Sequence, residues 1–191
     1  MTNEAYTVRA LTDSEIADNY RQRMKRDFPP NELKPLRMIR KSVERGIYEC
    51  LGMFAGDALL GYAFLLRSGR VLLLDYFAVD AQRRGTGIGS QFLGYLRENL
   101  QADAVIIESE NPALSASDAE RETRERRLRF YFRSGCVDSG LRAHVFGADY
   151  RVLQLPINSE IDADTLKNEY LTLYRTMLPE TLFRRNIRVE G

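Results

Sequence analysis

Apolar and polar residues alternate near the start of the chain and then recur at helical spacing. The stretch YTVRAL alternates like a short strand, and Asp13 or Ser14 can cap a helix that follows it. This helix runs toward Arg26 and ends at FPPN, because proline rarely continues a helix. A second helix is predicted over residues 32–45, closed by Gly46.

The middle of the chain is dominated by strand-like runs. IYECLGMFAGDALLGYAFLLRSGRVLLLDYFAVD predicts three strands with turns at AGD and RSGR. ADAVIIES, residues 102–109, predicts another strand, and HVFGADYRVLQLPI closes the sheet. Between them, DAERETRERRLRFYFRS predicts a charged helix whose solvated face carries ion pairs four residues apart, with Arg126 or Arg127 placed to reach a substrate or cofactor.

A last helical pattern follows Pro156. It is capped by Asp162 or Asp164 and stopped by Pro179. Its apolar face comprises Leu166, Tyr170, Leu173, Tyr174 and Met177. We therefore divide the chain into a domain at residues 1–156 and a helical extension at 157–191 on or near the same domain. The extension packs against its own sheet, covers the mouth of a site, or mediates a homodimer.

Composition and charge limit the classes of function. With 191 residues, 44% of them hydrophobic, the chain suits one globular domain with a sizeable core. The 28 basic and 27 acidic residues give a net charge of +1, which argues against a nucleic-acid partner. Cys50 and Cys136 stand far apart, which argues against a disulfide framework or a metal site. No signal-peptide pattern or long apolar run occurs, so we expect a cytoplasmic protein without a membrane partner.

The stretch DAQRRGTGIGSQFL places Gly85, Gly87 and Gly89 between a strand pattern and a helical pattern. Glycine exposes backbone N–H groups and tolerates dihedral angles that a Cβ forbids, so such a loop can wrap around a polar ligand. The first turn of a helix adds unpaired N–H groups and the positive end of the helix dipole, which together bind phosphate. The loop therefore predicts an anionic ligand.

Three phosphate-binding loops compete for this stretch. The dinucleotide fingerprint G-x-G-x-x-G fails because it would require glycine at Ser90 or Phe92. The nucleoside-triphosphate loop G-x-x-x-x-G-K-[ST] does not occur in the sequence. The remaining pattern, R-G-x-G-x-G led by Arg84, resembles the pyrophosphate loop of the GNAT superfamily of N-acetyltransferases. In that superfamily a valine ends the strand four or five residues before the arginine, and Val79 fills this place.

A second motif of the same superfamily lies downstream. RRLRFYFRSGC resembles it, with Tyr131 four residues before Gly135. LDYFAVD, ESENP and FGADYRVL resemble a bacterial branch of the superfamily. The resemblance implies an α+β fold with a mixed, mostly antiparallel central sheet, splayed central strands and flanking helices, and it implies acetyl-CoA as co-substrate with no metal. The chain departs from the motif at Arg124 and Arg127, where asparagine and alanine are usual.

The resemblance also assigns roles to particular residues. The backbone of Phe77 would polarise the thioester carbonyl, and that of Val79 would pair with the pantetheine amides. Tyr131 takes the position of the general acid that protonates the departing thiolate; the alternative is a tyrosine that only packs among its neighbours. The pyrophosphate is expected on the backbone N–H groups of the loop, which comprises Arg84, Gly85, Thr86, Gly87, Ile88, Gly89 and Ser90.

Three carboxylates are candidates for the base that removes a proton from the acceptor amine. Strand alternation puts Asp75 on the same face as Phe77 and Val79, and it puts Glu108 and Glu110 on one face of the neighbouring strand. Carboxylates gathered in a confined site raise one another's pKa and attract a cationic amine. The alternative is that the two glutamates lie at a solvated strand end and Asp75 accepts backbone hydrogen bonds.

These observations favour an acetyl-CoA-dependent N-acetyltransferase that moves the acetyl group directly to a primary amine. The acceptor is expected to be a small cationic molecule or an exposed amino group. The altered second motif supports another hypothesis, a catalytically silent acyl-CoA-binding or sensing module. A third, nucleotide binding by a generic glycine loop, is disfavoured by the two failed fingerprints.

Overall fold

The computed structural model describes residues 6–191, and the chain divides into two compact units. Among the described residues, the first comprises residues 6–66 together with Asp75–Tyr95, and the second comprises Arg67–Leu74 together with Leu96–Gly191. Within residues 6–191, no helix combines the length and apolar character that crossing a membrane requires.

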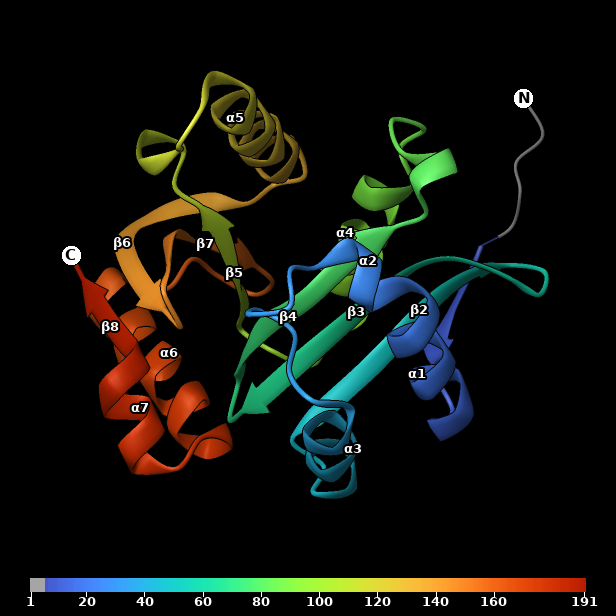
Figure 1. Cartoon of the computed structure of the whole chain (residues 1–191), viewed down its shortest axis with the longest axis horizontal. Coiled ribbons are helices and arrows are strands. Elements are labelled where there is room, and N and C mark those ends of the chain that lie inside the picture. The colour runs from blue at the N-terminus through green and yellow to red at the C-terminus, as the bar shows by residue number, and fades with distance from the viewer. Residues whose placement is uncertain (1–5) are drawn as a thin grey trace. The chain divides into compact units, whose positions relative to one another are not determined.

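Helices and strands alternate irregularly along both units (Figure 1). Up to residue 99 they are, in chain order, β1 (Thr7–Ala10), α1 (Asp13–Asn19), a π-helical segment (Tyr20–Met24), α2 (Lys25–Asp27), α3 (Leu36–Glu44), β2 (Tyr48–Ala55), β3 (Ala58–Ser68), β4 (Val71–Val79), a 3₁₀ turn (Ala81–Arg83) and α4 (Ile88–Asn99). They continue with β5 (Ala104–Glu110), a 3₁₀ turn (Pro112–Leu114), α5 (Asp118–Arg133), β6 (Val137–Val145), β7 (Ala148–Pro156), α6 (Ala163–Met177), α7 (Glu180–Asn186) and β8 (Ile187–Glu190).

The strands are hydrogen-bonded in the order β1-β2-β3-β4-β5-β7-β6-β8. β4 and β5 pair in parallel, from Val71↔Ala104 to Leu74↔Ile107. The pairs β1·β2, β2·β3, β5·β7, β6·β7 and β6·β8 are antiparallel. The predicted α+β fold with a mixed, mostly antiparallel sheet and flanking helices is therefore confirmed.

Aromatic side chains form the centre of the first unit. Tyr62 and Phe64 lie two residues apart on β3, and both are fully buried. The Phe64 ring meets Tyr62 at 5.7 Å and Tyr76 of β4 at 6.2 Å, both edge to face, which is a favourable arrangement of aromatic rings. The predicted turn AGD joins β2 to β3 with Gly56 at φ +55°, a backbone angle that glycine adopts without strain.

The first helix begins one residue earlier than a cap at Asp13 or Ser14 would allow. Thr12 is the cap: its hydroxyl accepts the Glu15 N–H, and the Glu15 carboxylate accepts the Thr12 N–H at 2.8 Å. This reciprocal pair is a capping box, which satisfies two N–H groups at once. The helical stretch then continues to Asp27 and ends before FPPN, as predicted.

The second helix is shorter than predicted, because Tyr76 binds the segment that precedes it. The Tyr76 hydroxyl donates to the Glu32 carbonyl at 2.8 Å and accepts the Lys34 N–H at 2.8 Å. These bonds hold residues 32–34 in a non-helical conformation, so α3 starts only after Pro35.

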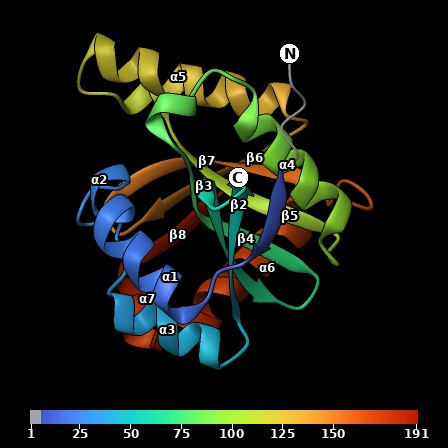
Figure 2. The ribbon, with the colours of Figure 1, turned by 90° about the vertical axis from the view of Figure 1, so that its right-hand side faces the viewer.

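In the second unit, α5 lies on one side of β6 and β7, and α6 and α7 lie on the other (Figures 1 and 2). Asp162 caps α6 by accepting the Thr165 N–H, and the predicted apolar face of this helix is buried. The carboxyl-terminal strand β8 was not predicted, and it pairs with β6. Residues 157–191 thus supply a strand as well as helices; the domain boundary after residue 156 stays a prediction.

Candidate functional site

The glycine-rich stretch forms a turn from β4 to α4, as the sequence predicts. β4 ends at Val79, Asp80 accepts the Gln82 N–H at 2.9 Å, and α4 begins at Ile88. Residues 81–87 are exposed to solvent. The first N–H groups of an α-helix have no acceptor within the helix, and together with the helix dipole they suit an anion.

Two of the three glycines have backbone angles that other residues rarely adopt. The φ angle is +80° at Gly85 and +92° at Gly87. The Gly87 carbonyl accepts the Gln91 N–H at 3.0 Å and so begins the hydrogen bonds of the helix. Gly89 lies inside α4, where the backbone is right-handed. Gly85 and Gly87 are therefore the glycines that shape the turn.

Charged side chains hold the start and the middle of this turn. Arg84 donates from Nε to the Val79 carbonyl at 3.4 Å, and its Nη2 lies 3.9 Å from a buried carboxylate oxygen of Asp27. Where the turn leaves β4, Arg23 Nη2 lies 3.5 Å from Asp80. These contacts limit the freedom of the turn in the absence of a ligand, which lowers the entropy cost of binding one.

The end of β4 is positioned by close packing. The Phe77 ring packs against Phe92 of α4, with centroids 5.6 Å apart. A Cβ at Gly61 of β3 would lie 2.9 Å from the Ala78 carbonyl oxygen, so the two strands approach closely beside Phe77 and Val79. The backbone atoms to which the resemblance assigns the thioester and pantetheine contacts therefore have little room to move.

Asp75 is bound by other side chains. Its carboxylate, only 4% exposed, accepts hydrogen bonds from Lys34 Nζ at 2.6 Å and from the Tyr48 hydroxyl. Burial, followed by the charge of Asp75, raises the pKa of Tyr48 well above its ordinary value. The Lys34 ammonium and the Tyr48 hydroxyl thus occupy both oxygens of the Asp75 carboxylate.

Glu108 connects β5 to α6. Its carboxylate accepts hydrogen bonds from the Tyr170 hydroxyl and, at 2.6 Å, from the Tyr174 hydroxyl. Both tyrosines are fully buried, and their rings meet edge to face at 5.3 Å. Burial, followed by the charge of Glu108, raises the pKa of Tyr170 well above its ordinary value. Two phenol donors thus fix the orientation of the Glu108 carboxylate.

Glu110 is bound by α5. Arg124 Nη2 lies 3.0 Å from one carboxylate oxygen and Arg127 Nη1 lies 2.7 Å from the other. Arg124 also donates to the Asn111 carbonyl at 2.9 Å and to Glu120 at 2.6 Å. These arginines occupy the two positions at which the sequence departs from the second motif. The departure therefore has a structural reason, because both guanidinium groups attach α5 to the end of β5.

Tyr131 lies near the end of α5 and is 7% exposed. The helix ends just after it, where the Cys136 N–H donates to the Tyr131 carbonyl and Gly135 adopts a φ of +90°. Burial raises the pKa of Tyr131 to about 12, while the positive charge of Arg127 lowers it. The hydroxyl therefore stays protonated at neutral pH, the state that a general acid requires.

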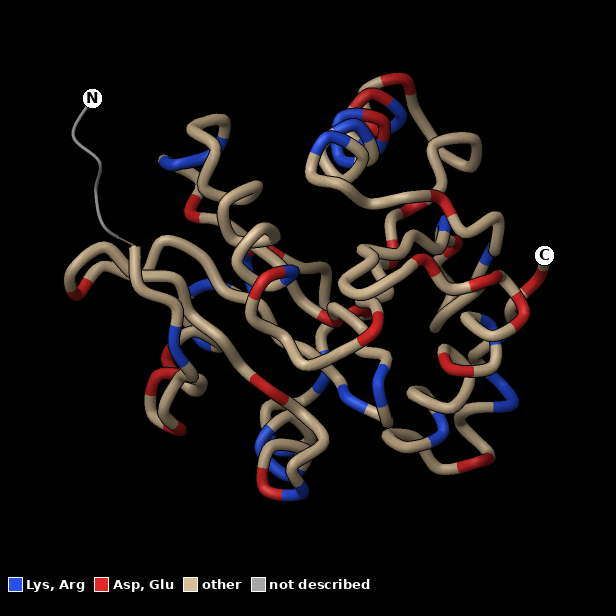
Figure 3. The backbone as a smooth tube through the Cα atoms, turned by 180° about the vertical axis from the view of Figure 1, so that it is seen from behind, with Lys and Arg blue, Asp and Glu red and all other residues tan. Residues whose placement is uncertain are grey.

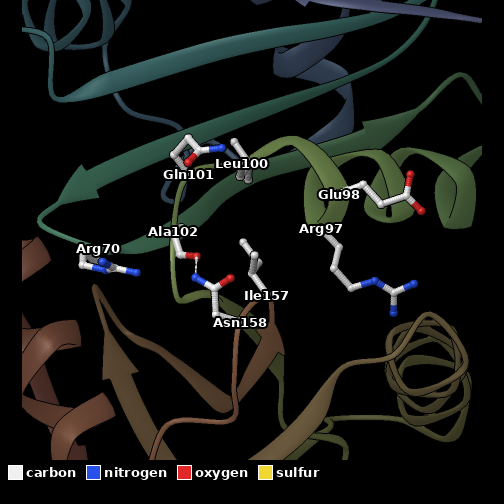
Figure 4. A pocket seen from close by; sticks show the side chains of 8 residues that line it. All are labelled: Arg70, Arg97, Glu98, Leu100, Gln101, Ala102, Ile157 and Asn158. Carbon is white, nitrogen blue, oxygen red and sulfur yellow. Dashed lines mark hydrogen bonds between the residues drawn. The ribbon is translucent and has the colours of Figure 1, made fainter.

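A cavity of about 360 Å³ lies at the amino end of β5 in the second unit (Figure 4). Arg70 is engaged by Asp103, to which its Nε donates at 2.8 Å, and the Asn158 amide donates to the Ala102 carbonyl at 3.0 Å. The sequence analysis selected none of its lining residues, and the cavity lies at the opposite end of β5 from Glu108 and Glu110. The lining residues are Arg70, Arg97, Glu98, Leu100, Gln101, Ala102, Ile157 and Asn158.

No family model matches the sequence, and no curated protein matches it either. A structure described as a GNAT-family acetyltransferase from Bacteroides thetaiotaomicron matches with a TM-score of 0.68 and 21% identity, over 90% of this chain and 98% of that one. The chain has the GNAT fold. Spermidine N-acetyltransferase from Vibrio cholerae (TM-score 0.58, 14% identity, 81% of this chain and 95% of that one) shares this fold. So does an aminoglycoside 6′-N-acetyltransferase in complex with coenzyme A (TM-score 0.58, 15% identity, 82% and 99%).

Within this GNAT fold, the residues predicted to bind the cofactor lie together in the first unit. Phe77 and Val79 end β4, and residues 84–90 form the turn and the start of α4. Glu108 and Glu110 lie in the second unit and are bound by different helices, α6 and α5.

The side chains that bind the candidate carboxylates leave no signal in the local sequence. Nothing in local spacing connects Lys34 with Asp75, which is 41 residues away. The burial of Tyr170 and Tyr174 on α6 was predicted, but their hydrogen bonds to Glu108 were not. Alternation identifies the face of a helix or strand, whereas the partner across an interface depends on the tertiary fold.

Proposed function

We propose that the protein transfers an acetyl group from acetyl-CoA to a primary amine, on a small cationic molecule or an exposed amino group. The observation that carries this proposal is the exposed turn from β4 to α4, with left-handed Gly85 and Gly87 ahead of the helix, in a chain with the GNAT fold. Structural neighbours named for spermidine and for aminoglycosides, one of them in complex with coenzyme A, support both the donor and the acceptor class.

The chain would hold the co-substrate mainly through its backbone. The N–H groups of residues 84–90 bind the pyrophosphate, and hydrogen bonds to such a charged acceptor contribute about 1.5–3 kcal/mol each. The backbone of Phe77 and Val79 orients the thioester and the pantetheine amides. Because backbone atoms make these contacts, side-chain identity matters most where the backbone angle requires glycine, at Gly85 and Gly87.

Acetyl transfer then needs one proton donor and one proton acceptor. The neutral amine attacks the thioester carbonyl carbon, the C–S bond breaks with its electron pair on sulfur, and the Tyr131 hydroxyl gives its proton to the thiolate. The attacking nitrogen loses its extra proton to water as the amide forms. An alkylammonium group has a pKa of about 10.4, so the acceptor amine must lose a proton before it attacks.

Glu108 is the carboxylate that we propose as the base. Its hydrogen-bond donors are two neutral phenols, which fix its orientation, whereas Asp75 is paired with a cation at Lys34 and Glu110 with two guanidinium groups. Glu108→Gln and Glu110→Gln keep the shape of each side chain and remove its basicity. If Glu108 is the base, Glu108→Gln should lose more activity at neutral pH than Glu110→Gln. Equal losses would contradict this assignment and leave Asp75, Glu108 and Glu110 as equal candidates for the base.

A catalytically silent acyl-CoA-binding module is the second candidate. The observation that favours it is the pairing of Arg124 and Arg127 with Glu110, because these positions of the second motif are used here to attach a helix.

Acetyl-CoA binding and thiol release, measured together, test both candidates. Wild-type protein is titrated with acetyl-CoA by calorimetry, and free thiol is then followed with spermidine, an aminoglycoside and a lysine-containing peptide as acceptors. An acetyltransferase binds acetyl-CoA saturably and releases thiol in proportion to the amine. A silent module binds without amine-dependent release. Tighter binding of ATP or NAD than of acetyl-CoA would contradict both candidates and revive the generic nucleotide site.

A further inference from the structure

Arg127 and Tyr131 lie four residues apart on α5, which places them one turn apart on the same face of the helix. Figure 3 shows that α5 carries basic and acidic residues along its length. The Arg127 side chain is 44% exposed, and its Nη1 lies 2.7 Å from Glu110 of β5. Arg124 binds the other oxygen of the same carboxylate at 3.0 Å, so Glu110 is itself fixed.

The surroundings of Tyr131 make its phenolate form costly. The side chain is 7% exposed, and burial disfavours a charged group. Two further groups act on the pKa of this hydroxyl: Arg127 lowers it and Cys136 raises it. Arg97 of α4 acts on Cys136 and approaches Gly135, where its Nη1 would lie 2.9 Å from an added Cβ. Arg127 is thus the group that opposes the effect of burial on Tyr131.

We propose that Arg127, held by Glu110, is a positioning residue that acts through Tyr131. Its positive charge, paired with Glu110 and one helical turn away, stabilises the phenolate that forms when the Tyr131 hydroxyl gives its proton to the departing thiolate. The proton moves from phenol oxygen to sulfur, and the phenolate regains a proton from solvent before the next turnover. This inference rests on the proposed function, and it gives a chemical reason for an arginine at a position where the second motif has alanine.

The acidity of Tyr131 tests the proposal without any enzyme activity. A ring-fluorinated tyrosine placed at position 131 has a more acidic phenol, and its phenolate absorbance can be titrated in the folded protein. In this background, Arg127→Gln should raise the phenol pKa by about 0.5–1 unit, as expected for loss of one charge at this distance in a partly solvated site. Arg127→Lys should keep most of the wild-type value.

Arg129→Gln is the matched control. It removes the same charge from the same helix, but Arg129 lies two residues from Tyr131, on a different side of the helix, where it pairs with Glu125 at 3.4 Å. We expect the phenol titration to be unchanged in this variant. Equal shifts in Arg127→Gln and Arg129→Gln, or no shift in either, would overturn the proposal.

Steady-state kinetics supply the second readout. Arg127→Gln should lower kcat about 3- to 10-fold and leave KM for acetyl-CoA unchanged. It should also move the alkaline limb of the plot of kcat against pH to higher pH. A variant that only disturbed packing would lower kcat without moving that limb. If wild-type protein released no amine-dependent thiol, the proposed function would fail, while the phenol titration would still decide the effect of Arg127. Normal thiol release with an unshifted limb would overturn this inference alone.

Discussion

The turn from β4 to α4 and the candidate carboxylates are built in different ways. The turn depends on backbone geometry, with Gly85 and Gly87 in left-handed conformations within a stretch of about ten residues. Glu108 and Glu110 depend on side chains that come from 62 and 17 residues away, at Tyr170 and Arg127. A site made of backbone can be recognised from local sequence, whereas a site made of paired side chains emerges only when the chain folds.

The comparison also predicts how the two regions respond to substitution. Side-chain changes in the turn should matter little unless they alter a backbone angle or remove the contacts of Arg84 and Asp80. Changes among the paired side chains should expose unbalanced charge or unsatisfied hydrogen bonds, which cost stability even where no catalytic role exists. Activity and stability therefore have to be measured side by side.

The largest effect is expected for Tyr131→Phe. Only a hydroxyl is lost, so folding and acetyl-CoA affinity should stay close to wild type. Turnover should fall by roughly 100- to 10,000-fold, the usual range for loss of a general acid. Single-turnover thiol release measures the chemical step directly. A rate within twofold of wild type would leave Tyr131 with a packing role only.

The next effect concerns the buried pair of Lys34 and Asp75. Lys34→Met leaves the Asp75 carboxylate buried beside Tyr48 without its cation, which should lower the free energy of unfolding by about 3 kcal/mol. The double variant Lys34→Met with Asp75→Asn removes both charges and should recover most of this loss. Urea denaturation measures all three proteins.

The same double variant tests whether Asp75 takes part in the proposed reaction. If Asp75 serves only to hold Lys34 and Tyr48, thiol release by the refolded double variant should stay near the wild-type rate. A large loss of the thiol-release rate at neutral pH would make Asp75 the base in place of Glu108.

A smaller effect is expected where α6 meets β5. Tyr170→Phe removes one of two phenol donors to Glu108 and should lower the free energy of unfolding by about 1–3 kcal/mol. In the Glu108→Gln background the same change should cost less, because a neutral amide needs the donor less than a carboxylate does. Thr172→Ala, an exposed change on α6, serves as the control and should cost less than about 0.5 kcal/mol. Strictly additive effects of Tyr170→Phe and Glu108→Gln would show that the hydrogen bond adds no stability.

The smallest effect is expected at the capping box of α1. The pKa of Glu15 is lowered to about 2, first by its hydrogen bond to Arg9 and then by the Thr12 N–H. Because this pKa is lower in the folded protein, ionised Glu15 stabilises the fold fully above about pH 4.3, the pKa of glutamate in the unfolded chain. This stabilisation is lost as the pH falls toward 2. Glu15→Gln should therefore reduce stability at pH 7 by less than about 1 kcal/mol, since the pair is partly exposed. Thermal unfolding of wild type and Glu15→Gln at pH 7 and pH 2 checks this prediction. A difference in Tm between the two proteins that is as large at pH 2 as at pH 7 would contradict it.

Local sequence patterns predicted most of the fold, because runs, spacing and turn residues reflect which positions are buried. The three strands of the middle third follow from apolar runs bounded by turn residues, and the charged helix and the buried face of α6 follow from helical spacing. β6 begins at Val137, earlier than predicted, because a bulge between Asp138 and Arg142 and a φ of +81° at Gly140 interrupt the alternation. β8 has four residues, too few to show a period.

The candidate site was only partly predictable for the same reason. The turn could be located because glycine spacing reports backbone angles directly. The use of Arg124 and Arg127 to bind Glu110 could not be predicted, because a charged helix with internal ion pairs has the same pattern whether or not some of its arginines bind another element.

The central claim is that the backbone of the turn binds the pyrophosphate of acetyl-CoA, and calorimetric titration of two glycine variants tests it most directly. Gly85 and Gly56 both have a positive φ, and among the described residues no heavy atom lies within 4 Å of a Cβ added at either position. Gly85→Val and Gly56→Val therefore impose comparable backbone strain. We predict that Gly85→Val weakens acetyl-CoA binding at least about tenfold, a loss of roughly 1.4 kcal/mol, while Gly56→Val leaves it unchanged. Equal affinity in wild type and both variants would contradict the account.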